Sequence, residues 1–374
     1  MKQLSKYIII FLLPISILTY CGSKNSSHIK ELVLEVPENV NENDLLYNFI
    51  EQSGDIVNSD AAPALVVADE VASNLSKYLV LDIRNHDAYV DGHIDGAIQV
   101  NASDLMDYLD KEASPANYEK IVLACYSGQT AAYYTSLLRF AGYGNVFALK
   151  YGMSGWSKKI SDNKWTANIS NNYAGLIETK GYQKGEKHEF PKIETGATTG
   201  FDIMKARVNA VSEEGFGKAI IKVDTVMQHP DKYYIINYWP MDRYVLGHLP
   251  GAVQYTPKTS LKKEADLSYL PTDKPIVVYC YTGQHSAFVA AYLRILGYDA
   301  HSLAYGANGF MNAKMQAEIG HAFGPSVDIN DYELVAGEKP SLKTVETTSN
   351  AVSSEKPVIT PPKKKKKEAS SGGC

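Results

Sequence analysis

The sequence of 374 residues predicts an α/β protein made of two similar domains, each a parallel β-sheet flanked by helices on both faces. Two observations lead to this prediction: one pattern of residues occurs twice along the chain, and short apolar runs alternate with stretches of helical character. Apolar residues make up 45% of the chain and charged residues 21%, which is typical of a folded protein with enough apolar surface for two domains of ordinary size.

The repeat has a fixed offset of 155 residues, the spacing between Cys125 and Cys280. Further pairs keep this offset: Ala64 and Ala219, Asp82 and Asn237, Asp87 and Asp242, Gly92-His93 and Gly247-His248, Gly96-Ala97 and Gly251-Ala252, Arg139 and Arg294. Near the end the register shifts by one residue, where Tyr151–Trp156 corresponds to Tyr305–Phe310. So many matches in one register are not a coincidence, and we infer that the two halves are copies of one domain.

Two short apolar runs in each copy predict buried strands. They cover residues 79–83 and 121–125 in the first copy, and residues 234–236 and 276–280 in the second. The apolar residues are continuous rather than alternating, which is typical of parallel strands covered on both faces.

A stretch of helical pattern follows each cysteine, over residues 131–141 in the first copy and 286–296 in the second. Each stretch stops at a glycine, Gly142 or Gly297, in the position expected of a helix C-cap. The alternation of strand, loop and helix places both cysteine loops at the carboxyl ends of strands, where parallel sheets bind ligands.

These patterns divide the whole chain into segments with different expected roles. We expect a signal peptide at 1–20, an N-terminal tether with a lead-in helix at 21–60, the first domain at 61–170, a linker at 171–199, the second domain at 200–330 and a disordered Lys-rich tail at 337–374. The linker and the tail are rich in polar residues and lack an apolar period, so neither can form a core of its own.

The N-terminus has the charge pattern of an export signal. Lys2 and Lys6 precede an apolar run at 7–18, which is too short to span a membrane comfortably. Cys21 follows in a sequence that resembles a bacterial lipobox, in which the cysteine is acylated. Tyr20 is larger than the residue that a lipobox prefers, so ordinary cleavage nearby and a retained signal anchor are the alternatives. We expect a lipoprotein that is exported to the cell envelope and anchored in the membrane, on the periplasmic or surface side.

Charge and cysteine content exclude several classes of protein. The chain has 37 Lys and Arg against 42 Asp and Glu, a formal net charge of −5, so we expect no nucleic-acid partner. The four cysteines, Cys21, Cys125, Cys280 and Cys374, are too widely spaced for a disulfide-rich scaffold or a zinc module.

The two cysteine loops carry the candidate chemistry. The first is Cys125 with Tyr126, Ser127, Gly128, Gln129 and Thr130, and the second is Cys280 with Tyr281, Thr282, Gly283, Gln284 and His285. A loop between a strand and a helix can turn several N–H groups inward, and together with the helix dipole these groups are expected to lower the pKa of the thiol. The resulting thiolate is a nucleophile. Gly128 and Gly283 suit the positive φ that such a loop needs.

The chain resembles the rhodanese family at these loops and at the motifs around them, over roughly residues 60–165 and 215–315. The motifs are Leu81-Asp82-Ile83-Arg84, Gly92–Ala97 and Tyr151–Trp156 in the first copy, and Gly247–Ala252 and Tyr305–Phe310 in the second. The resemblance implies a sulfurtransferase in which Cys125 and Cys280 take a sulfane sulfur from thiosulfate or from a persulfide, which a partner protein could carry. The cysteine persulfide then passes this sulfur to a thiol or a cyanide-like acceptor. The resemblance also implies that neither a cofactor nor a metal is needed.

The chain departs from the family in two respects. Neither loop contains the Lys or Arg that members active on thiosulfate often carry there, so we expect anionic donors to bind weakly. The second copy has Asn237-Tyr238-Trp239 where the first has Asp82-Ile83-Arg84, so it lacks the Asp and Arg that brace a family domain. We therefore rank Cys125 ahead of Cys280 as the active cysteine.

Two other functions compete with sulfur transfer. A phosphatase of related architecture places an Arg six residues after the loop cysteine, where this chain has Ala131 and Ser286, so this alternative is the weaker one. A membrane-anchored, non-catalytic binding module with at least the second domain inactive is the stronger alternative, because of the altered Asn237-Tyr238-Trp239.

Three histidines near these motifs need an interpretation. His93 and His248 lie in Gly-His turns and are expected to brace the turn rather than transfer protons. His285 either donates to a bound anion or, like Thr130 at the equivalent position, acts as an ordinary hydrogen-bonding residue of the loop.

The C-terminal tail ends in a cysteine on a flexible Gly-Gly. We hypothesise that Cys374 is a resolving or sulfur-accepting thiol that reaches Cys125 or Cys280, with attachment to a surface as the alternative. The lysines at 363–367 are interpreted as a solvated segment that contacts at most an anionic lipid or another acidic surface.

Overall fold

Two parallel five-stranded sheets form the framework of the protein in the computed structural model, which describes residues 41–111 and 114–338. The first sheet has the strand order β1-β5-β4-β2-β3 and the second has the order β6-β10-β9-β7-β8. The two sheets therefore repeat one topology, and the prediction of two parallel α/β domains is confirmed.

The predicted apolar runs form the central strands of each sheet. The strands are β1 (Leu65–Val66), β2 (Tyr78–Asp82), β3 (Ile98–Gln99), β4 (Lys120–Ala124), β5 (Val146–Leu149), β6 (Ile220–Ile221), β7 (Tyr234–Asn237), β8 (Val253–Gln254), β9 (Ile276–Tyr279) and β10 (Ala300–Leu303). Side chains of β2 alternate between two cores: Leu79 and Leu81 face one core, while Tyr78 and Val80 face another. Each sheet is thus buried on both faces, as continuous apolar strands require.

Helices cover both faces of the sheets. They are α1 (Glu42–Gln52), α2 (Ala68–Ala72), α3 (His86–Asp91), α4 (Leu105–Lys111), α5 (Gln129–Phe140), α6 (Met153–Trp156), α7 (Lys158–Ser161), α8 (Trp165–Asn168), α9 (Gly200–Glu214), α10 (Val223–Gln228), α11 (Met241–Tyr244), α12 (Gln284–Ile295), α13 (Asn308–Lys314) and α14 (Pro325–Asp328). Among the helices of the described ranges, none combines the length and the apolar character needed to cross a bilayer.

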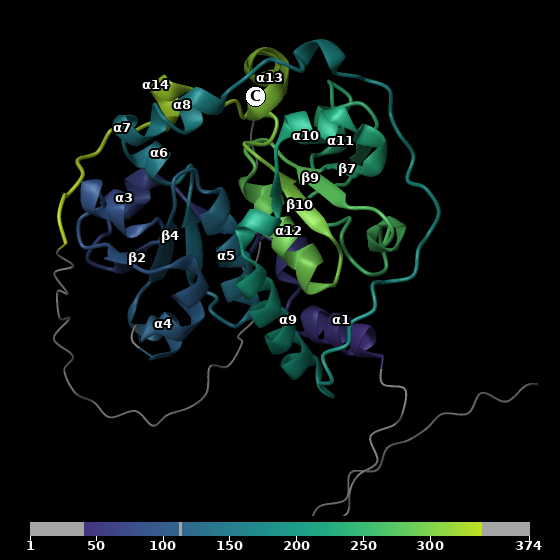
Figure 1. Ribbon diagram of the computed structural model, residues 1–374, viewed down its shortest axis with the longest axis horizontal. Helices are drawn as coiled ribbons and strands as arrows, with labels where there is room; N and C mark the ends of the chain where they lie inside the picture. The colour runs from purple at the N-terminus through teal and green to yellow at the C-terminus, as the bar shows by residue number, and fades with distance from the viewer. Residues whose placement is uncertain (1–40, 112–113, 339–374) are drawn as a thin grey trace, which may run out of the picture. The chain divides into compact units, whose positions relative to one another are not determined.

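The two domains share one apolar core between their sheets. In Figure 1, α5 and α12 lie side by side near the middle of the view, between β4 and β10. Almost every side chain of both helices is buried, as expected of helices that are apolar on most faces, and the rings of Phe140 and Tyr292 stack with their centroids 5.7 Å apart. Helix α9 packs on both of them, and α1 packs on α9.

The helices after the cysteine loops begin two residues earlier than predicted. Gly128 and Gly283 are the N-caps of α5 and α12, with φ of 81° and 77°, so the residues after them already belong to the first helical turn. A left-handed glycine lets the chain turn directly from strand to helix without the longer loop that we expected. At the other end, Gly142 and Gly297 follow the C-caps with φ of 106° and 94°, as predicted.

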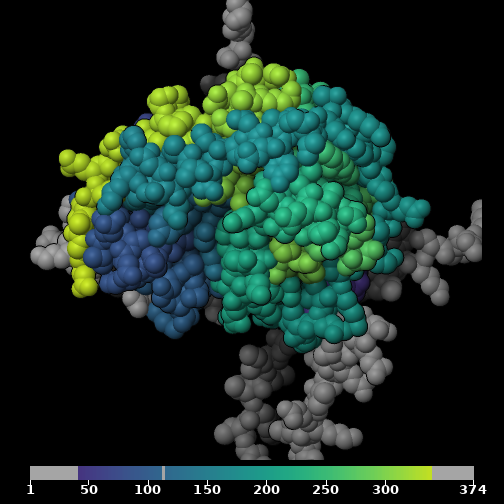
Figure 2. Space-filling model, turned by 45° about the horizontal axis from the view of Figure 1, so that its top comes forward, coloured from purple at the N-terminus to yellow at the C-terminus, as the bar shows by residue number. Residues whose placement is uncertain are grey.

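The segment that follows each domain crosses over to the other domain. After the first domain, Tyr173 donates its N–H to the carbonyl of Phe310 at 3.3 Å, and Glu178 pairs with His248 in an antiparallel bridge. After the second domain, Tyr332 donates to the carbonyl of Trp156 at 2.7 Å, and Val335 pairs with His93. Figure 2 shows this yellow C-terminal segment lying along the blue first domain. The predicted linker and the end of the chain thus tie the two domains together.

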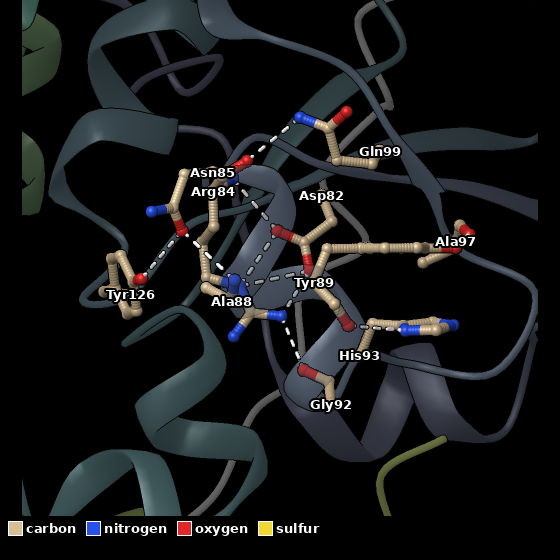
Figure 3. A network of polar contacts seen from close by, with 10 residues as sticks. All are labelled: Asp82, Arg84, Asn85, Ala88, Tyr89, Gly92, His93, Ala97, Gln99 and Tyr126. Atoms are coloured by element: carbon tan, nitrogen blue, oxygen red, sulfur yellow. Dashed lines mark hydrogen bonds and ion pairs between the residues drawn. The ribbon is translucent and has the colours of Figure 1, made fainter. Parts of the chain in front are cut away.

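A buried ion pair fixes the end of β2 in the first domain. Arg84 donates from Nε to Asp82 Oδ1 at 2.9 Å and from Nη2 to Oδ2 at 2.5 Å, and both side chains are 1% exposed. Figure 3 shows that the same Arg84 Nη2 also reaches the carbonyl of Gly92, at 2.7 Å. The guanidinium therefore connects the strand to the turn after α3.

The second domain replaces this ion pair by neutral groups. The hydroxyl of Tyr279 accepts hydrogen bonds from Asn237 Nδ2 at 2.9 Å and from the N–H of Leu249 at 3.1 Å. Trp239, at the position of the missing arginine, is fully buried and stacks on Tyr281 with ring centroids 4.8 Å apart. The expected loss of the Asp and Arg is real, and a tyrosine hydroxyl and an indole ring fill the space.

The two Gly-His turns have a structural role, as expected. The rings of His93 and His248 stack on Tyr89 and Tyr244 with centroids 3.8 Å apart, and both histidines are almost completely buried. The Nδ1–H of His93 donates to the carbonyl of Tyr89 at 2.8 Å.

Replacing Arg84 by Met should destabilise the first domain, because the carboxylate of Asp82 is then buried without its counter-ion. We expect the free energy of unfolding, measured by urea denaturation, to fall by about 3–5 kcal/mol. The control is Lys77→Met, which breaks an exposed ion pair with Glu119 and should cost less than about 1 kcal/mol. Equal losses in the two variants would contradict the bracing role of Arg84.

Candidate active site

Cys125 is the first residue after β4 and lies at the N-terminus of α5. Its Sγ accepts hydrogen bonds from the N–H groups of Gly128 at 3.1 Å and Ala131 at 3.3 Å. The positive end of the dipole of α5 points at the same atom. The expected inward-facing amides are therefore present, and they can stabilise negative charge on this sulfur.

Burial opposes these donors at Cys125. The residue is only 4% exposed, and burial raises the pKa of its thiol by more than the N–H groups of Ala131, Ser127 and Gly128 and the hydroxyl of Thr130 lower it. Our prediction that the loop lowers the pKa of the thiol is thus wrong for Cys125. The amide geometry follows from the local sequence, whereas the burial of the thiol depends on the packing of the apolar core around the loop.

Cys280 occupies the equivalent place after β9, with different neighbours. Its Sγ accepts from the N–H of Ser286 at 3.3 Å, and its S–H donates to Ser286 Oγ at 3.6 Å. That hydroxyl also forms a hydrogen bond of 2.8 Å with Ser302. Cys280 is 2% exposed, so both loop cysteines are buried thiols at the start of a helix.

Cations near the first loop come from outside it. Lys164 Nζ lies 4.4 Å from the ring centroid of Tyr126, and the guanidinium carbon of Arg84 lies 5.6 Å from it. The hydroxyl of Tyr126 donates to Asn85 Oδ1 at 3.3 Å. No sequence signal pointed to Lys164, because it lies 39 residues after Cys125 in the chain.

The second loop also has basic residues beside its tyrosine. His321 stacks on Tyr281 with ring centroids 4.3 Å apart. Burial, followed by the charges of Arg243 and Lys150, lowers the pKa of His321. Lys150 belongs to the first domain, so both domains contribute to the surroundings of this loop.

His285 is uncharged at neutral pH. Its ring packs edge-on against Tyr238 with centroids 4.9 Å apart, and burial, with a smaller effect of Lys258, lowers its pKa to about 3. His285 Nε2 is buried without a hydrogen-bond partner among the described residues. The hydrogen bond from His285 to a bound anion stays a prediction, and a neutral imidazole N–H would donate it.

The remaining predicted residues of the loops have simpler positions. Ser127 Oγ accepts from Gln129 Nε2 at 3.0 Å, and the Ser127 carbonyl accepts from Trp165 Nε1 at 3.0 Å. Thr282 is half-buried in the second loop. The predicted lipidation site Cys21 and the predicted resolving thiol Cys374 lie outside the described residues.

The two loops meet at the boundary between the domains, and the sequence did not reveal this. Four aromatic residues that we had not assigned to the site pack together there. They are Tyr151, Trp165, Tyr305 and Phe323, with ring centroids 4.7 to 5.2 Å apart. Burial, together with a smaller effect of the charge of Cys125, raises the pKa of Tyr305 to about 12, so the second domain contributes to the electrostatic surroundings of the first loop.

Alkylation should reveal the raised pKa of Cys125. We expect the rate with iodoacetamide, followed by peptide-resolved mass spectrometry, to rise with a pH midpoint above the ordinary thiol value of about 8.5, because burial disfavours the thiolate. The same cysteine in the urea-unfolded chain is the control. A lower midpoint in the folded protein than in the unfolded chain would contradict this assignment.

Acid should destabilise the protein through His285. The folded-state pKa of about 3 lies below the usual value of about 6.5, so the unfolded chain binds a proton that the folded chain does not, and stability is lost as the pH falls between these values. His285→Phe keeps a ring against Tyr238 and should flatten the dependence of the unfolding free energy on pH in this window. The control is His86→Phe, at an exposed position whose ring contacts only the exposed carboxylate of Glu338 among the ion pairs of the described residues, and it should change this dependence less.

Comparison with known proteins places these features in one family. The family model of the rhodanese-like domain matches residues 67–159 and 225–313. The thiosulfate sulfurtransferase GlpE of Shewanella oneidensis is 30% identical over 78 residues, which are 21% of this chain and 73% of that protein.

Solved structures of similar proteins cover parts of the chain. The crystal structure of a thiosulfate sulfurtransferase from Pseudomonas aeruginosa is 22% identical with a TM-score of 0.26, and the match covers 70% of this chain and 46% of that one. The solution structure of a rhodanese-like domain from Anabaena sp. is 27% identical with a TM-score of 0.23, and the match covers 24% of this chain and 70% of that one. Each segment matched by the family model contains four of the five strands of one repeated sheet, and the chain belongs to the rhodanese-like family, with two such domains in tandem.

Proposed function

We propose that the protein is a sulfurtransferase that moves a sulfane sulfur from thiosulfate or a persulfide to a thiophilic acceptor through a cysteine persulfide. The observation that carries this proposal is the Sγ of Cys125, which accepts two main-chain hydrogen bonds at the N-terminus of α5. Membership of a sulfurtransferase family supports the reaction class.

The proposed reaction needs a cysteine thiolate and hydrogen-bond donors that stabilise its negative charge. The Cys125 thiolate attacks the outer sulfur of the donor, a new S–S bond forms, and the bond within the donor breaks, so that the leaving group, sulfite in the case of thiosulfate, takes the electron pair. The acceptor then attacks the outer sulfur of the persulfide, and the thiolate is restored. The N–H groups of Gly128 and Ala131 stabilise the sulfur anion in the first and last states.

The basic residues around the loops support an anionic donor, whereas the loop sequences by themselves predict that such a donor binds weakly. Lys164 lies beside Tyr126 at the first loop, while Arg243 and Lys150 act on His321 beside Tyr281 at the second. A cation outside the loop can attract thiosulfate as well as one within it, because the attraction depends on distance rather than on sequence position.

The second candidate function is a non-catalytic binding module, at least for the second domain. The observation that favours it is the neutral replacement of the Asp and Arg brace by Asn237, Trp239 and the hydroxyl of Tyr279. In this alternative only Cys125 reacts with a sulfur donor and an acceptor. The second domain then contributes contacts to the first domain but no reaction of its own.

We also propose that the chain is an exported lipoprotein, acylated on Cys21, and that Cys374 accepts sulfur or resolves the persulfide. Both proposals are supported by sequence pattern alone, since these residues lie outside the described ranges. Mass spectrometry of the protein from its membrane fraction tests the first, and a bridge from Cys374 to Cys125 or Cys280 tests the second.

Serine variants separate the candidate functions. In a cyanide-dependent assay with thiosulfate, Cys125→Ser should lose activity by about 100-fold or more, because serine cannot form the persulfide. Cys280→Ser should lose less, and the intact mass after incubation with donor should show one added sulfur for each loaded site. A double variant that turns over as fast as the parent, with unchanged thermal stability, would refute the proposed function.

A further inference from the structure

Each domain places one glutamine side chain against the other domain, at the point where the cysteine loops meet. Gln129 Oε1 accepts a hydrogen bond from the N–H of Tyr305 at 2.8 Å, and Gln284 Oε1 accepts one from the N–H of Tyr151 at 3.2 Å. Each glutamine is the first residue of its helix, directly behind the N-cap glycine of its own loop. Each tyrosine belongs to the opposite domain, so the two contacts are reciprocal.

The two tyrosines whose N–H groups donate these hydrogen bonds have a strained backbone. Tyr151 has a φ of 62° and Tyr305 a φ of 60°, in the left-handed region that residues with a bulky side chain seldom adopt. Such a conformation persists only where surrounding contacts hold it. A glutamine from the other domain supplies one of these contacts in each case.

The strained residue in the first domain sets the position of the cysteine loop. The residue after Tyr151 is Gly152, where a Cβ atom would lie 2.3 Å from the carbonyl oxygen of Cys125. Met153 then donates its N–H to that carbonyl at 2.7 Å, and Ser154 donates to the carbonyl of Tyr126 at 3.1 Å. The turn that begins at Tyr151 therefore packs directly against the first cysteine loop and holds it by these hydrogen bonds.

The second domain repeats this construction. A Cβ atom on Gly306 would lie 2.4 Å from the carbonyl oxygen of Cys280. Ala307 donates its N–H to the same carbonyl at 3.0 Å, and Asn308 donates to the carbonyl of Tyr281 at 3.2 Å.

The glycine of each loop lies directly against the glutamine side chain of the other domain. A Cβ atom on Gly128 would lie 2.3 Å from Gln284 Nε2, and one on Gly283 would lie 2.4 Å from Gln129 Oε1. A displacement of one loop therefore meets the glutamine of the other domain.

We propose that Gln129 and Gln284 are positioning residues that act across the domain boundary, so that Gln284 of the second domain sets the reactivity of Cys125 and Gln129 of the first domain sets that of Cys280. The path from Gln284 runs through Tyr151 and its turn to the Cys125 loop. The sites are coupled because sulfur bound at one cysteine changes the loop that carries the glutamine serving the other. This proposal builds on Cys125 and Cys280 as the reacting thiols of the proposed function.

The glutamines are not needed to hold the domains together. The shared core between the sheets and the packing of α5 on α12 already do so, with Phe140 stacked on Tyr292. The crossing segments at Glu178 and Val335 add further contacts. We therefore expect loss of a glutamine to change the chemistry of the opposite cysteine more than the stability of the fold.

The test measures one cysteine while the glutamine of the other domain is changed. In the full chain carrying Cys280→Ser, Gln284→Met keeps the side-chain volume but removes the acceptor for Tyr151. The rate of alkylation of Cys125 by iodoacetamide is followed against pH by peptide-resolved mass spectrometry, and thermal unfolding reports the fold. Gln52→Met, at an exposed position in α1, is the matched control.

We expect the pH midpoint of Cys125 alkylation to fall by about half a unit in Gln284→Met, with about threefold faster reaction below the midpoint, because the loosened loop admits water to the thiol. Gln129→Met should act in the same way on Cys280 in the chain carrying Cys125→Ser. If Gln284→Met does not fold, Gln284→Asn, which keeps the amide but is too short to reach Tyr151, replaces it.

A Cys125 rate and midpoint equal to those of the Gln52 control would overturn the proposal. Because alkylation needs no sulfur donor, this result is separate from the fate of the proposed function: a response of Cys125 to Gln284 supports the coupling even in a protein that transfers no sulfur.

Discussion

The hydrogen bonds from N–H groups at the start of α5 and α12 to the two cysteine sulfurs are the interaction on which the proposed site depends. Each helix begins at a left-handed glycine directly behind a strand-end cysteine, which turns main-chain donors toward the sulfur. The parallel topology places each cysteine at the carboxyl edge of its sheet, because the carboxyl ends of parallel strands lie together at one edge. The same two helices form the contact between the domains, so each sulfur site also lies at the domain boundary.

Duplication followed by divergence explains the differences between the halves. The first domain keeps a buried ion pair of Asp82 and Arg84, while the second uses Asn237, Tyr279 and Trp239 in the same space. A neutral network avoids the cost of burying charge, so the loss of the ion pair need not weaken the domain. The cysteine loops share one backbone conformation at the glycine, since Gly128 and Gly283 have nearly the same φ.

The exchange of segments makes the two domains dependent on each other. Residues after the first domain pair with His248, and residues after the second pair with His93. Each Gly-His turn therefore has its outer edge covered by a chain segment that begins in the opposite half. Together with the reciprocal glutamines, these contacts join the surroundings of the two cysteine loops into one structural unit.

The sequence by itself determined the parallel α/β fold, the repeat, the strand-end cysteines and the glycines of the loops, because each depends on short-range pattern: a continuous apolar run, a fixed offset, or the φ that only glycine adopts freely. Only the tertiary structure decided the burial of the thiols, the basic residues near Tyr126 and Tyr281, and the contacts of Gln129 and Gln284 with the opposite domain. These depend on which residues that are distant in the chain come together in the folded protein, within one domain or across the boundary between the two. Lys164 and Tyr305 are distant from Cys125 in the chain, and a pattern read along the chain contains no distance between such residues.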